Sequence, residues 1–532
     1  MPITRTCRIS WKEFIIRDEE IALLDKLSPL IWWEKFELPL PTISPEERFR
    51  RKLPFKNYLI LFKRTDSKSW KQIISSYPPD SIYTVYSQPH WWSDSWDPLD
   101  YGKIYSASNI IEQIHVLWRS VPVPSLDNAY LENINSDHVN GCGPSKDCYL
   151  TSNSAYNEKC LYGWFIFNST YSLDCNKISD SHYCSNSQHL RKCYNIHFSW
   201  DSSDCRDSRY IFSCNGCQNI LGGVWLKNQK YQILNMPCTP WQYESTLLRL
   251  WKEYNFRQEF EKKVQLLVSK LGLSKNILTG SIESTGDFCY DSKNAYECYN
   301  TRDCEDVFYI RDSFQTRDSA HISMWWDDTS LSYDSIDVGL NVCNIYWSTS
   351  CWEGSVYNFY SHKCNNCQYI FGCSWLRNKS YCIFNKQYTK KEWENTVKVI
   401  IRQMQSEWSW GEFLDPKYAP FAYNESLGAY FSPLTRDEAF KRGFIWSDRE
   451  EVIPEGITKV IPWERLPENI SEVPDDVLYW AIKCPKTGKY FQIQPLELEM
   501  LRKFSLPTPR VHPIERIKLR LGWDKREFSF DF

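Results

Sequence analysis

The chain has 532 residues and carries 63 basic against 66 acidic side chains, which gives a net charge of −3. This balance excludes a bulk attraction to nucleic acid or to an anionic membrane, although it is compatible with a local basic patch. There is no run of about 18 apolar residues, and the start MPITRTCRIS lacks the apolar core of a signal peptide, so we expect a cytoplasmic protein, or one within an assembly, without membrane insertion.

The first predicted element is a small module over 1–60 that recurs over 476–532. Seven residues match at an offset of 477: Cys7, Lys12, Phe14, Ile16, Glu20, Leu24 and Lys26 match Cys484, Lys489, Phe491, Ile493, Glu497, Leu501 and Lys503. The segment LPLPTISPEER (38–48) then matches LPTPRVHPIER (506–516) at an offset of 468. The stretch CPKTGKYFQI predicts a hairpin with a Thr-Gly turn, followed by a helix. Two look-alike modules therefore flank the rest of the chain.

An aromatic-rich connecting region follows over 61–126. It contains Trp91, Trp92 and Trp96, which together with Trp325 and Trp326 are candidate stacking platforms for sugars or unpaired bases. The alternative is that these rings cover the flanks of the repeats and the contacts between modules.

The region 127–240 contains a cysteine repeat whose spacings are all multiples of three. Its members are Cys142, Cys148, Cys160, Cys175, Cys184, Cys193, Cys205, Cys214 and Cys217. A helix has a period of 3.6 residues and a strand a period of two, so neither alone sustains this pattern. The residue before these positions is often Asn or Asp, which tolerates left-handed backbone and favours turns. Short extended sides with frequent corners, in coils of 12 to 15 residues, fit the spacing.

The same arrangement recurs downstream. CNGCQNILGGVWLKNQKYQILN (214–235) matches CNNCQYIFGCSWLRNKSYCIFN (364–385) at an offset of 150, which places a second repeat over 283–387. Each repeat precedes a helix, predicted over 241–272 and 388–408, because Thr239 with Gln242 and Thr389 with Glu392 form capping boxes. An irregular linker region over 409–475 completes the chain.

The fold class we predict is therefore mainly β with helices. It consists of two duplicated narrow β-solenoid modules, each followed by a capping helix, between the two small end modules. Left-handed extended bundles with three residues per turn are the rival geometry, but they require more glycine than the 19 residues present. The cysteines predicted to form the inward column are Cys148, Cys160, Cys175, Cys184, Cys193, Cys205, Cys289, Cys298, Cys304, Cys343, Cys373 and Cys382; Cys351 alone is out of phase.

Four features resemble a family of large, uncharacterised, cysteine-rich proteins of reduced-genome bacteria that often carry the label CaiB/BaiF. They are SSYPPDSIYTVYSQPHWWSDSWDPLDYG (75–102), the C-x-x periodicity, the pattern CxxCQxIxGxxWL[KR]N and the pattern LPxPxxxPxER. The resemblance covers most of the chain and implies end modules of the zinc-ribbon type with paired CxxC knuckles. Here each end retains one cysteine, Cys7 or Cys484, so we expect degenerate ribbons without zinc. No nucleotide-binding βαβ unit supports the transferase activity that the label implies.

The pairs Cys214/Cys217 and Cys364/Cys367 are the candidate metal ligands, because four thiolates suit zinc. Their spacing is already explained by the column, in which CxxC is two adjacent positions and free cysteine packs as a small apolar side chain. We therefore expect no cofactor, with a zinc site or redox use of these thiols as the alternatives.

Carboxylates and basic segments supply the other candidates. Asp201, Asp204 and Asp207, or Asp327 and Asp328, suit calcium or glycoside hydrolysis, but their spacing is also that of the turns. The basic segments RFRRKLPFKN (48–57) and ERIKLRLGWDKR (515–526) suit phosphate, or a solvated helix face.

No catalytic motif emerges, so we expect a non-catalytic structural and interaction scaffold within a larger protein assembly, with protein partners or self-association. A protein that binds RNA or single-stranded DNA is the first alternative. A carbohydrate-active β-helix protein is the second.

Overall fold

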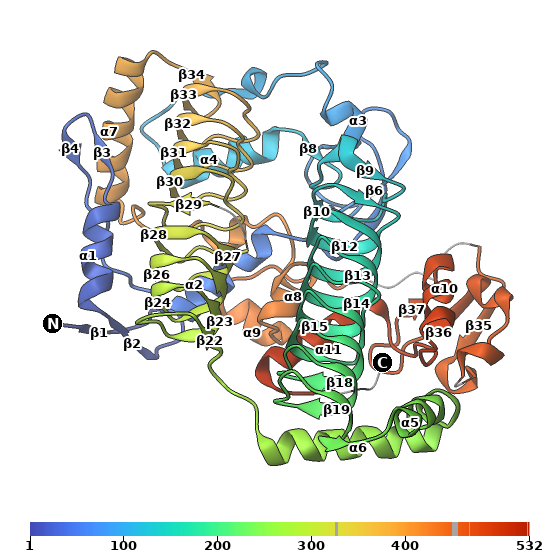
Figure 1. The fold of residues 1–532 in the computed structure, drawn as a ribbon. Helices are drawn as coiled ribbons and strands as arrows, with labels where there is room; N and C mark the ends of the chain where they lie inside the picture. Colours follow the sequence, from blue (N-terminus) through green and yellow to red (C-terminus); the bar gives the residue numbers. More distant parts are fainter. Residues whose placement is uncertain (325–327, 450–455, 468, 529, 531–532) are drawn as a thin grey trace. The chain divides into compact units, whose positions relative to one another are not determined.

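The computed structural model describes residues 1–532 except 325–327, 450–455, 468, 529 and 531–532. The chain is a mixed α/β protein with many short strands, and it divides into two compact units (Figure 1). Unit 1 comprises 1–57, 62–125 and 274–447, and unit 2 comprises 58–61, 126–273 and 448–532. Each unit thus combines one cysteine repeat with one end of the chain.

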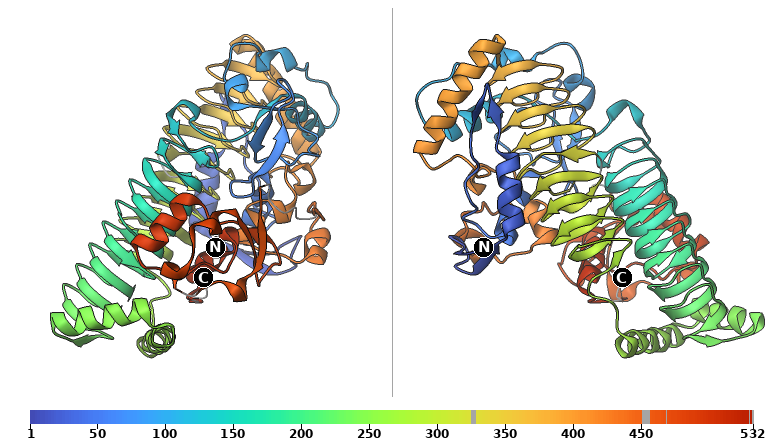
Figure 2. Two further views of the ribbon diagram at one scale, coloured as in Figure 1. Left: turned by 90° about the vertical axis from the view of Figure 1, so that its right-hand side faces the viewer. Right: turned by 60° about the vertical axis from the view of Figure 1, so that its left-hand side comes forward.

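Unit 2 contains a stack of parallel strands in which each residue pairs with the residue 12 positions later. Cys160 pairs with Ser172, and Cys175 pairs with Ser187. Figure 2 shows the strands as successive rungs. They are β9 (Asn133–Ile134), β10 (Asn140–Cys142), β11 (Ser145–Lys146), β12 (Tyr149–Ser154), β13 (Asn157–Phe167), β14 (Thr170–Ser179), β15 (Ser185–Arg191), β16 (Tyr194–His197), β17 (Trp200–Ser203), β18 (Arg206–Phe212), β19 (Gln218–Val224), β20 (Lys230–Ile233) and β21 (Met236–Pro237), the last being antiparallel to β20.

Unit 1 contains a similar stack whose step changes along the chain. Gly286 pairs with Cys298 at a step of 12, whereas Thr316 pairs with Thr329 and Cys343 with Val356 at a step of 13. The strands are β22 (Leu278–Thr279), β23 (Gly286–Tyr290), β24 (Lys293–Tyr296), β25 (Cys298–Arg302), β26 (Glu305–Phe308), β27 (Arg311–Phe314), β28 (Thr316–Ala320), β29 (Thr329–Ser330), β30 (Val342–Tyr346), β31 (Val356–Phe359), β32 (Gln368–Phe371), β33 (Ser380–Ile383) and β34 (Lys386–Gln387).

The backbone of both stacks enters the left-handed region at every third residue. A typical run in unit 2 has positive φ at Tyr171, Asp174, Lys177, Asp180, Tyr183 and Asn186. A coil of 12 residues therefore has four corners. The sequence predicts Asn and Asp at such corners, but tyrosine and lysine occupy them as well. Because left-handed backbone costs a residue with a side chain about 1–2 kcal/mol, the interactions of the stack must offset this strain repeatedly.

Inward serine and cysteine side chains hydrogen-bond the corners from within. The hydroxyl of Ser181 donates to the Ser179 carbonyl at 2.8 Å and accepts the Cys193 N–H at 3.2 Å. Cys205 takes the same role, since its Sγ lies 3.2 Å from the Ser203 carbonyl and accepts the Cys217 N–H at 3.4 Å. The column therefore uses small side chains that both donate and accept, so these cysteines are more than space-filling groups.

The predicted column cysteines lie in two buried core clusters, one in each unit, with one exception. Cys343 is only half-buried and lies outside the cluster, whereas Cys351 is fully buried within it. The 13-residue coils explain this correction, because one extra residue per coil shifts the three-residue phase. All 21 cysteines are free thiols.

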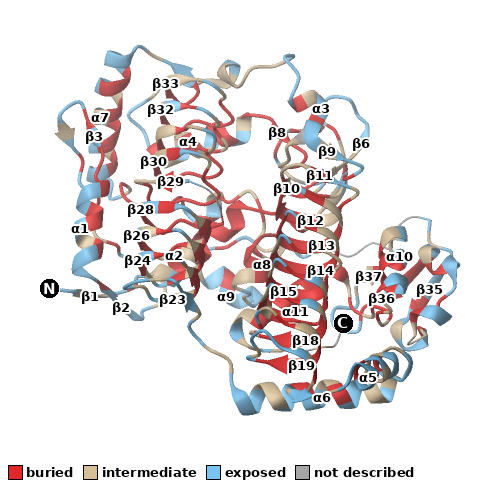
Figure 3. Cartoon of the chain, viewed as in Figure 1, coloured by how far each residue is buried: buried red, intermediate tan, exposed pale blue. Residues whose placement is uncertain are grey.

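Helices follow both stacks, and both predicted capping boxes are present. The hydroxyl of Thr239 accepts the Gln242 N–H at the start of α5 (Pro240–Lys252), which continues into α6 (Tyr254–Leu271). Thr389 and Glu392 form the same cap on α7 (Lys390–Ser406). Figure 3 shows that α5 and α6 are mostly exposed, with buried positions such as Phe260 and Val264. No helix of the described part of the chain is long and apolar enough to span a membrane.

The two chain ends contain similar short elements. In unit 1 these are β1 (Ile3–Thr6), β2 (Glu13–Ile16), α1 (Asp18–Leu27), β3 (Leu30–Ile31), β4 (Glu34–Lys35) and α2 (Pro45–Lys52). In unit 2 they are β35 (Lys459–Pro462), β36 (Trp480–Lys483), β37 (Tyr490–Phe491), α10 (Pro495–Lys503) and α11 (Pro513–Gly522). The connecting region of unit 1 contributes β5 (Phe62–Thr65), β6 (Gln72–Ser75), β7 (Val85–Tyr86), α3 (Gln88–Trp91), α4 (Ile110–Ser120) and β8 (Val123–Pro124), and the linker region contributes α8 (Gly428–Phe431) and α9 (Arg436–Lys441).

Candidate functional site

The four candidate zinc ligands belong to the cores of their own units. Cys214 and Cys217 lie in the core cluster of unit 2, and Cys364 and Cys367 lie in that of unit 1. Burial raises the pKa of Cys367 to about 12, which holds this thiol in its protonated form. Within the described residues, no group of three or more His, Cys, Asp or Glu side chains is placed to hold a metal ion.

The predicted aromatic platform around Trp91 is packed. Trp91 is buried and contacts Trp92, Trp96 and Trp375 with ring centroids 4.7–5.7 Å apart. The guanidinium of Arg377 lies over Trp91 and Trp92 at 4.0 and 4.3 Å. These contacts occupy the faces that a ligand would need. Trp325 and Trp326 lie outside the described residues.

The predicted aspartates occupy corner positions. Asp201, Asp204 and Asp207 all have positive φ, and Asp207 accepts a hydrogen bond at 2.7 Å from Asn195, a corner residue one coil earlier. Asp328 is likewise a corner, and Asp327 lies outside the described residues.

The basic segments differ from both predictions made for them. Arg48 and Lys52 of α2, and Arg516 and Arg520 of α11, are buried and form ion pairs with carboxylates of the stacks. These side chains are therefore neither a solvated face nor a surface for phosphate.

Three turns of the molecule share one hydrogen-bonding pattern. The N–H groups of Cys7, Asp66 and Cys484 donate to the carbonyls of the residues five positions later, at 2.8–2.9 Å. The residue four positions later donates back to the first carbonyl and has positive φ; it is Trp11, Trp70 or Gly488, respectively. The third turn has glycine, which adopts this conformation without strain. The other two carry tryptophan in the sequences CRISWK and DSKSWK.

Both turn tryptophans project from the protein surface. Trp11 is 79% exposed and Trp70 is 80% exposed. Trp33, in the turn between β3 and β4, is also exposed and also has positive φ. The repeated letters SWK at 10–12 and 69–71 are the sequence signal that could have revealed the first two. A large apolar ring at a strained and exposed position contributes nothing to the core, so its role lies outside the fold.

A second feature is a buried ionic cluster in unit 2. The Arg516 guanidinium pairs with Glu497 at 2.8 Å and also with Asp174, while Arg520 pairs with Asp174 at 2.8 Å. The hydroxyl of Tyr162 donates to Glu497 at 2.6 Å. Every carboxylate of this cluster therefore has a charged partner.

The corresponding cluster in unit 1 has a different occupant at one corner. The corners that precede Gly222 at successive coils are Tyr210, Phe198, Asn186, Asp174 and Tyr162, and those that precede Gly372 are Tyr360, Trp347, Asp334, His321 and Tyr309. Counted in this way, His321 stands where unit 2 has Asp174. The helix residues correspond as the sequence offsets predict, with Glu20 in place of Glu497, Arg48 in place of Arg516 and Lys52 in place of Arg520.

The substitution of His321 for an aspartate leaves polar atoms unsatisfied. Arg48 and Lys52 turn to Asp334, one coil further, at 3.3 and 3.2 Å. Glu20 and His321 are each only 3% exposed, and their nearest atoms are 3.8 Å apart. Among the described residues, neither Oε2 of Glu20 nor Nε2 of His321 has a hydrogen-bond partner. Burial raises the pKa of Glu20 to about 7, against the opposing effects of Arg48 and Tyr309, and burial lowers the pKa of His321 well below its usual range.

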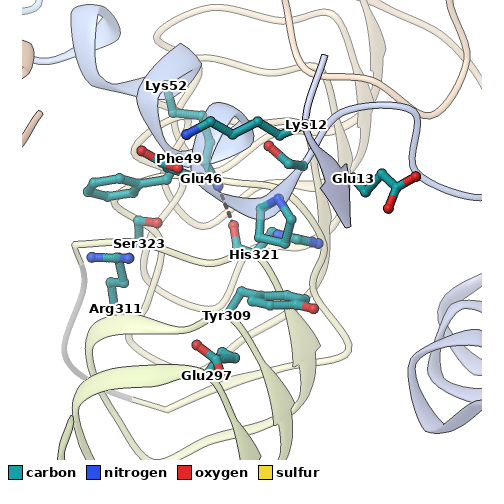
Figure 4. A pocket seen from close by; sticks show the side chains of 12 residues that line it. Lys12, Glu13, Glu46, Phe49, Lys52, Glu297, Tyr309, Arg311, His321 and Ser323 are labelled. Atoms are coloured by element: carbon teal, nitrogen blue, oxygen red, sulfur yellow. Dashed lines mark hydrogen bonds between the residues drawn. The ribbon is translucent and has the colours of Figure 1, made fainter. Parts of the chain in front are cut away.

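A pocket of about 310 Å³ lies beside this cluster (Figure 4). Its wall combines the turn between β1 and β2, helix α2 and the corners of the stack. The lining residues are Lys12, Glu13, Ser44, Pro45, Glu46, Phe49, Lys52, Glu297, Tyr309, Arg311, His321 and Ser323. Nothing in the sequence marks this pocket, because its residues come from three separate segments.

Comparison with protein-family models gives no match, and neither does comparison with curated proteins. Among solved structures, a protein described as a "putative acetyltransferase" from Desulfovibrio desulfuricans G20 is similar over 52% of this chain and 80% of its own, at 8% identity and a TM-score of 0.11. Similarity at this level carries no argument, so the functional conclusions depend on the residues described above.

Proposed function

We propose that this chain is a non-catalytic scaffold of two duplicated β-solenoid modules with degenerate ribbon-like ends, and that it binds other proteins within a larger assembly. The parallel pairing at steps of 12 and 13 residues supports the solenoid interpretation. The shared turn at Cys7 and Cys484 supports related end modules.

The observation that carries the binding role is the pair of exposed tryptophans at the turn tips. Gly488 has the same turn without strain, so Trp11 and Trp70 are there at a cost to stability. Tryptophan is enriched among the residues that dominate binding at protein interfaces, because one rigid ring buries a large apolar area. Two such rings on rigid hairpins fit the anchors of a protein interface.

The test replaces both rings with the residue that the third turn uses. The double variant Trp11→Gly/Trp70→Gly keeps the backbone conformation, so the fold should persist while cross-linked partners or self-association are lost. The matched control is Trp241→Ala, which removes an exposed tryptophan from the surface of α5. Retention of every partner by the double variant would contradict the proposal, as would purification of the wild type as a monomer without partners.

A metal assay tests the cofactor part of the proposal. Purified protein should contain no stoichiometric zinc, and 21 thiols should titrate after denaturation. One zinc ion per chain would overturn the structural role assigned to Cys214, Cys217, Cys364 and Cys367.

Single-stranded nucleic acid is the second candidate partner, because Lys12 and Lys71 directly follow the two tryptophans. A base can stack on such a ring while the neighbouring ammonium contacts a phosphate. This alternative requires oligonucleotide binding that weakens steeply with salt and disappears in the double tryptophan variant.

A further inference from the structure

The pocket of unit 1 has a graded distribution of charge. The acids in its wall, Glu13, Glu46 and Glu297, are exposed at the rim. The cations lie deeper, since Arg311 is half-buried and Lys52 is fully buried. The deep part of the wall is therefore cationic and holds no carboxylate among the described residues, which favours an anionic group.

Arg311 is positioned to receive that group. Its guanidinium lies over the ring of Phe49 at 4.5 Å, which fixes the plane of the cation while leaving its N–H edge available. In the described part of the chain, Arg311 has no carboxylate partner, and neither does Lys12 on the opposite wall. A planar, partly desolvated guanidinium suits bidentate hydrogen bonding to a carboxylate or phosphate.

The floor of the pocket adds hydrogen-bonding capacity. His321 lines the pocket and stacks on Tyr309 with ring centroids 4.8 Å apart. Leaving a buried polar atom unpaired costs about 1–3 kcal/mol, yet both His321 and the adjoining Glu20 contain one. In unit 2 the corresponding positions are fully paired by Asp174, Arg516 and Tyr162. The unpaired atoms thus occur only where a pocket adjoins them, so far as the two clusters are described.

We propose that this pocket binds a small molecule carrying a carboxylate or phosphate group. The anionic group pairs with Arg311 and Lys12, and the aromatic rings of Phe49 and Tyr309 contact the body of the ligand. A polar group of the ligand, or a water molecule that it orders, completes the hydrogen bonding of His321. This site is independent of the scaffold role, since none of its deep residues belongs to the exposed turn tips.

The experiment uses the full-length protein with ¹³C-labelled histidine, titrated separately with inorganic phosphate and with malonate. The His321 resonance, assigned by its loss in His321→Asp, should shift with a Kd of about 1 mM or tighter for at least one of the two anions. A response to phosphate alone identifies a phosphate-bearing ligand, and a response to malonate alone identifies a carboxylate-bearing one.

Two variants separate the site from the fold. Arg311→Gln should weaken binding at least tenfold, whereas Arg302→Gln, which removes a guanidinium packed on Tyr290 and Phe314 outside the pocket, should leave binding unchanged. His321→Asp introduces the residue of unit 2, so it should preserve folding, checked by circular dichroism, and abolish binding by charge repulsion. The proposal is overturned if neither anion shifts the His321 resonance, or if Arg311→Gln binds as the wild type does.

Discussion

The buried clusters of the two units are built from corresponding helices and corners, yet only one of them is saturated. In unit 2, Asp174 lies between Arg516 and Arg520, and Glu497 receives both Arg516 and the Tyr162 hydroxyl. In unit 1, a neutral histidine takes the aspartate's corner, and the cations reach one coil further to Asp334. One substitution in a common framework thus separates a structural ion-pair network from a cluster with unpaired polar atoms beside a pocket.

The largest effect should come from breaking the saturated cluster. Asp174→Asn keeps a side chain that tolerates the left-handed corner, but it leaves two buried arginines without their shared carboxylate. Removing one partner from a buried ion pair costs about 3–5 kcal/mol. We expect a loss of that size in the free energy of unfolding of β14, measured by native-state hydrogen exchange.

Asp180→Asn is the matched control, since Asp180 is a corner on the same strand stack with an exposed amide partner in Asn168. Its effect should stay within about 0.5 kcal/mol. Equal losses in the two variants would mean that the corner conformation matters and the ion pair does not.

The next comparison neutralises the corresponding glutamates. Glu497→Gln removes a charged hydrogen bond from Arg516 and should cost about 1.5–3 kcal/mol. Glu20→Gln should cost less than about 1 kcal/mol near neutral pH, because its Oε2 has no hydrogen-bond partner in the described residues and its pKa lies near 7. Hydrogen exchange in α10 and α1 reports each unit separately. A larger cost at Glu20 would contradict the distinction between the two clusters.

The pH dependence of unit 1 provides a third test. In the unfolded chain a glutamate titrates near about pH 4.3, whereas burial raises the pKa of Glu20 to about 7 in the folded protein. The folded state binds this proton more tightly, so the contribution of Glu20 to stability is fully present below the lower pKa and is lost as pH rises through the higher one. The stability of the wild type minus that of Glu20→Gln should therefore fall by about 1–3 kcal/mol between about pH 5 and pH 8.

The subtraction in that test removes the titration of His321, which acts in the opposite direction and is common to both proteins. A flat difference over this range would show that Glu20 titrates as an exposed carboxyl.

The smallest effect concerns the turns that carry Trp11 and Gly488. Gly488→Trp places a side chain at positive φ and should lower the free energy of unfolding of the β36–β37 hairpin by about 1 kcal/mol. Trp11→Gly should leave the stability of the β1–β2 hairpin unchanged or slightly raised, as measured by thermal unfolding. A marked loss in the second variant would show that Trp11 serves the fold.

Periodicity made much of this architecture predictable. The three-residue phase of the cysteines located the inward columns, and Thr239 and Thr389 marked where helices begin. The phase failed at Cys343 because a single inserted residue in a coil has no signature of its own. The hydrogen-bonding role of the column was also missed, since a thiol that accepts an N–H cannot be distinguished in sequence from one that only fills space.

The pocket and the ionic clusters could be predicted only in part. The offsets of 477 and 468 aligned Glu20 with Glu497 and brought the segment ending at Arg48 into register with the one ending at Arg516. They did not reveal which corner each helix contacts, because that depends on packing between segments hundreds of residues apart. His321 illustrates the limit, since one histidine among nine becomes distinctive only when it is seen to replace an aspartate.

The inward column of serine and cysteine also constrains how such genes can change in length. Each inward side chain bonds a backbone group one coil away, so a deletion or duplication of a whole coil preserves every bond of the coils that remain. A single added codon instead moves the next cysteine to a different side of the coil, as between Cys343 and Cys351. Over evolutionary time, related chains should therefore differ by whole coils, with isolated one-residue insertions marking places where a thiol has left the interior.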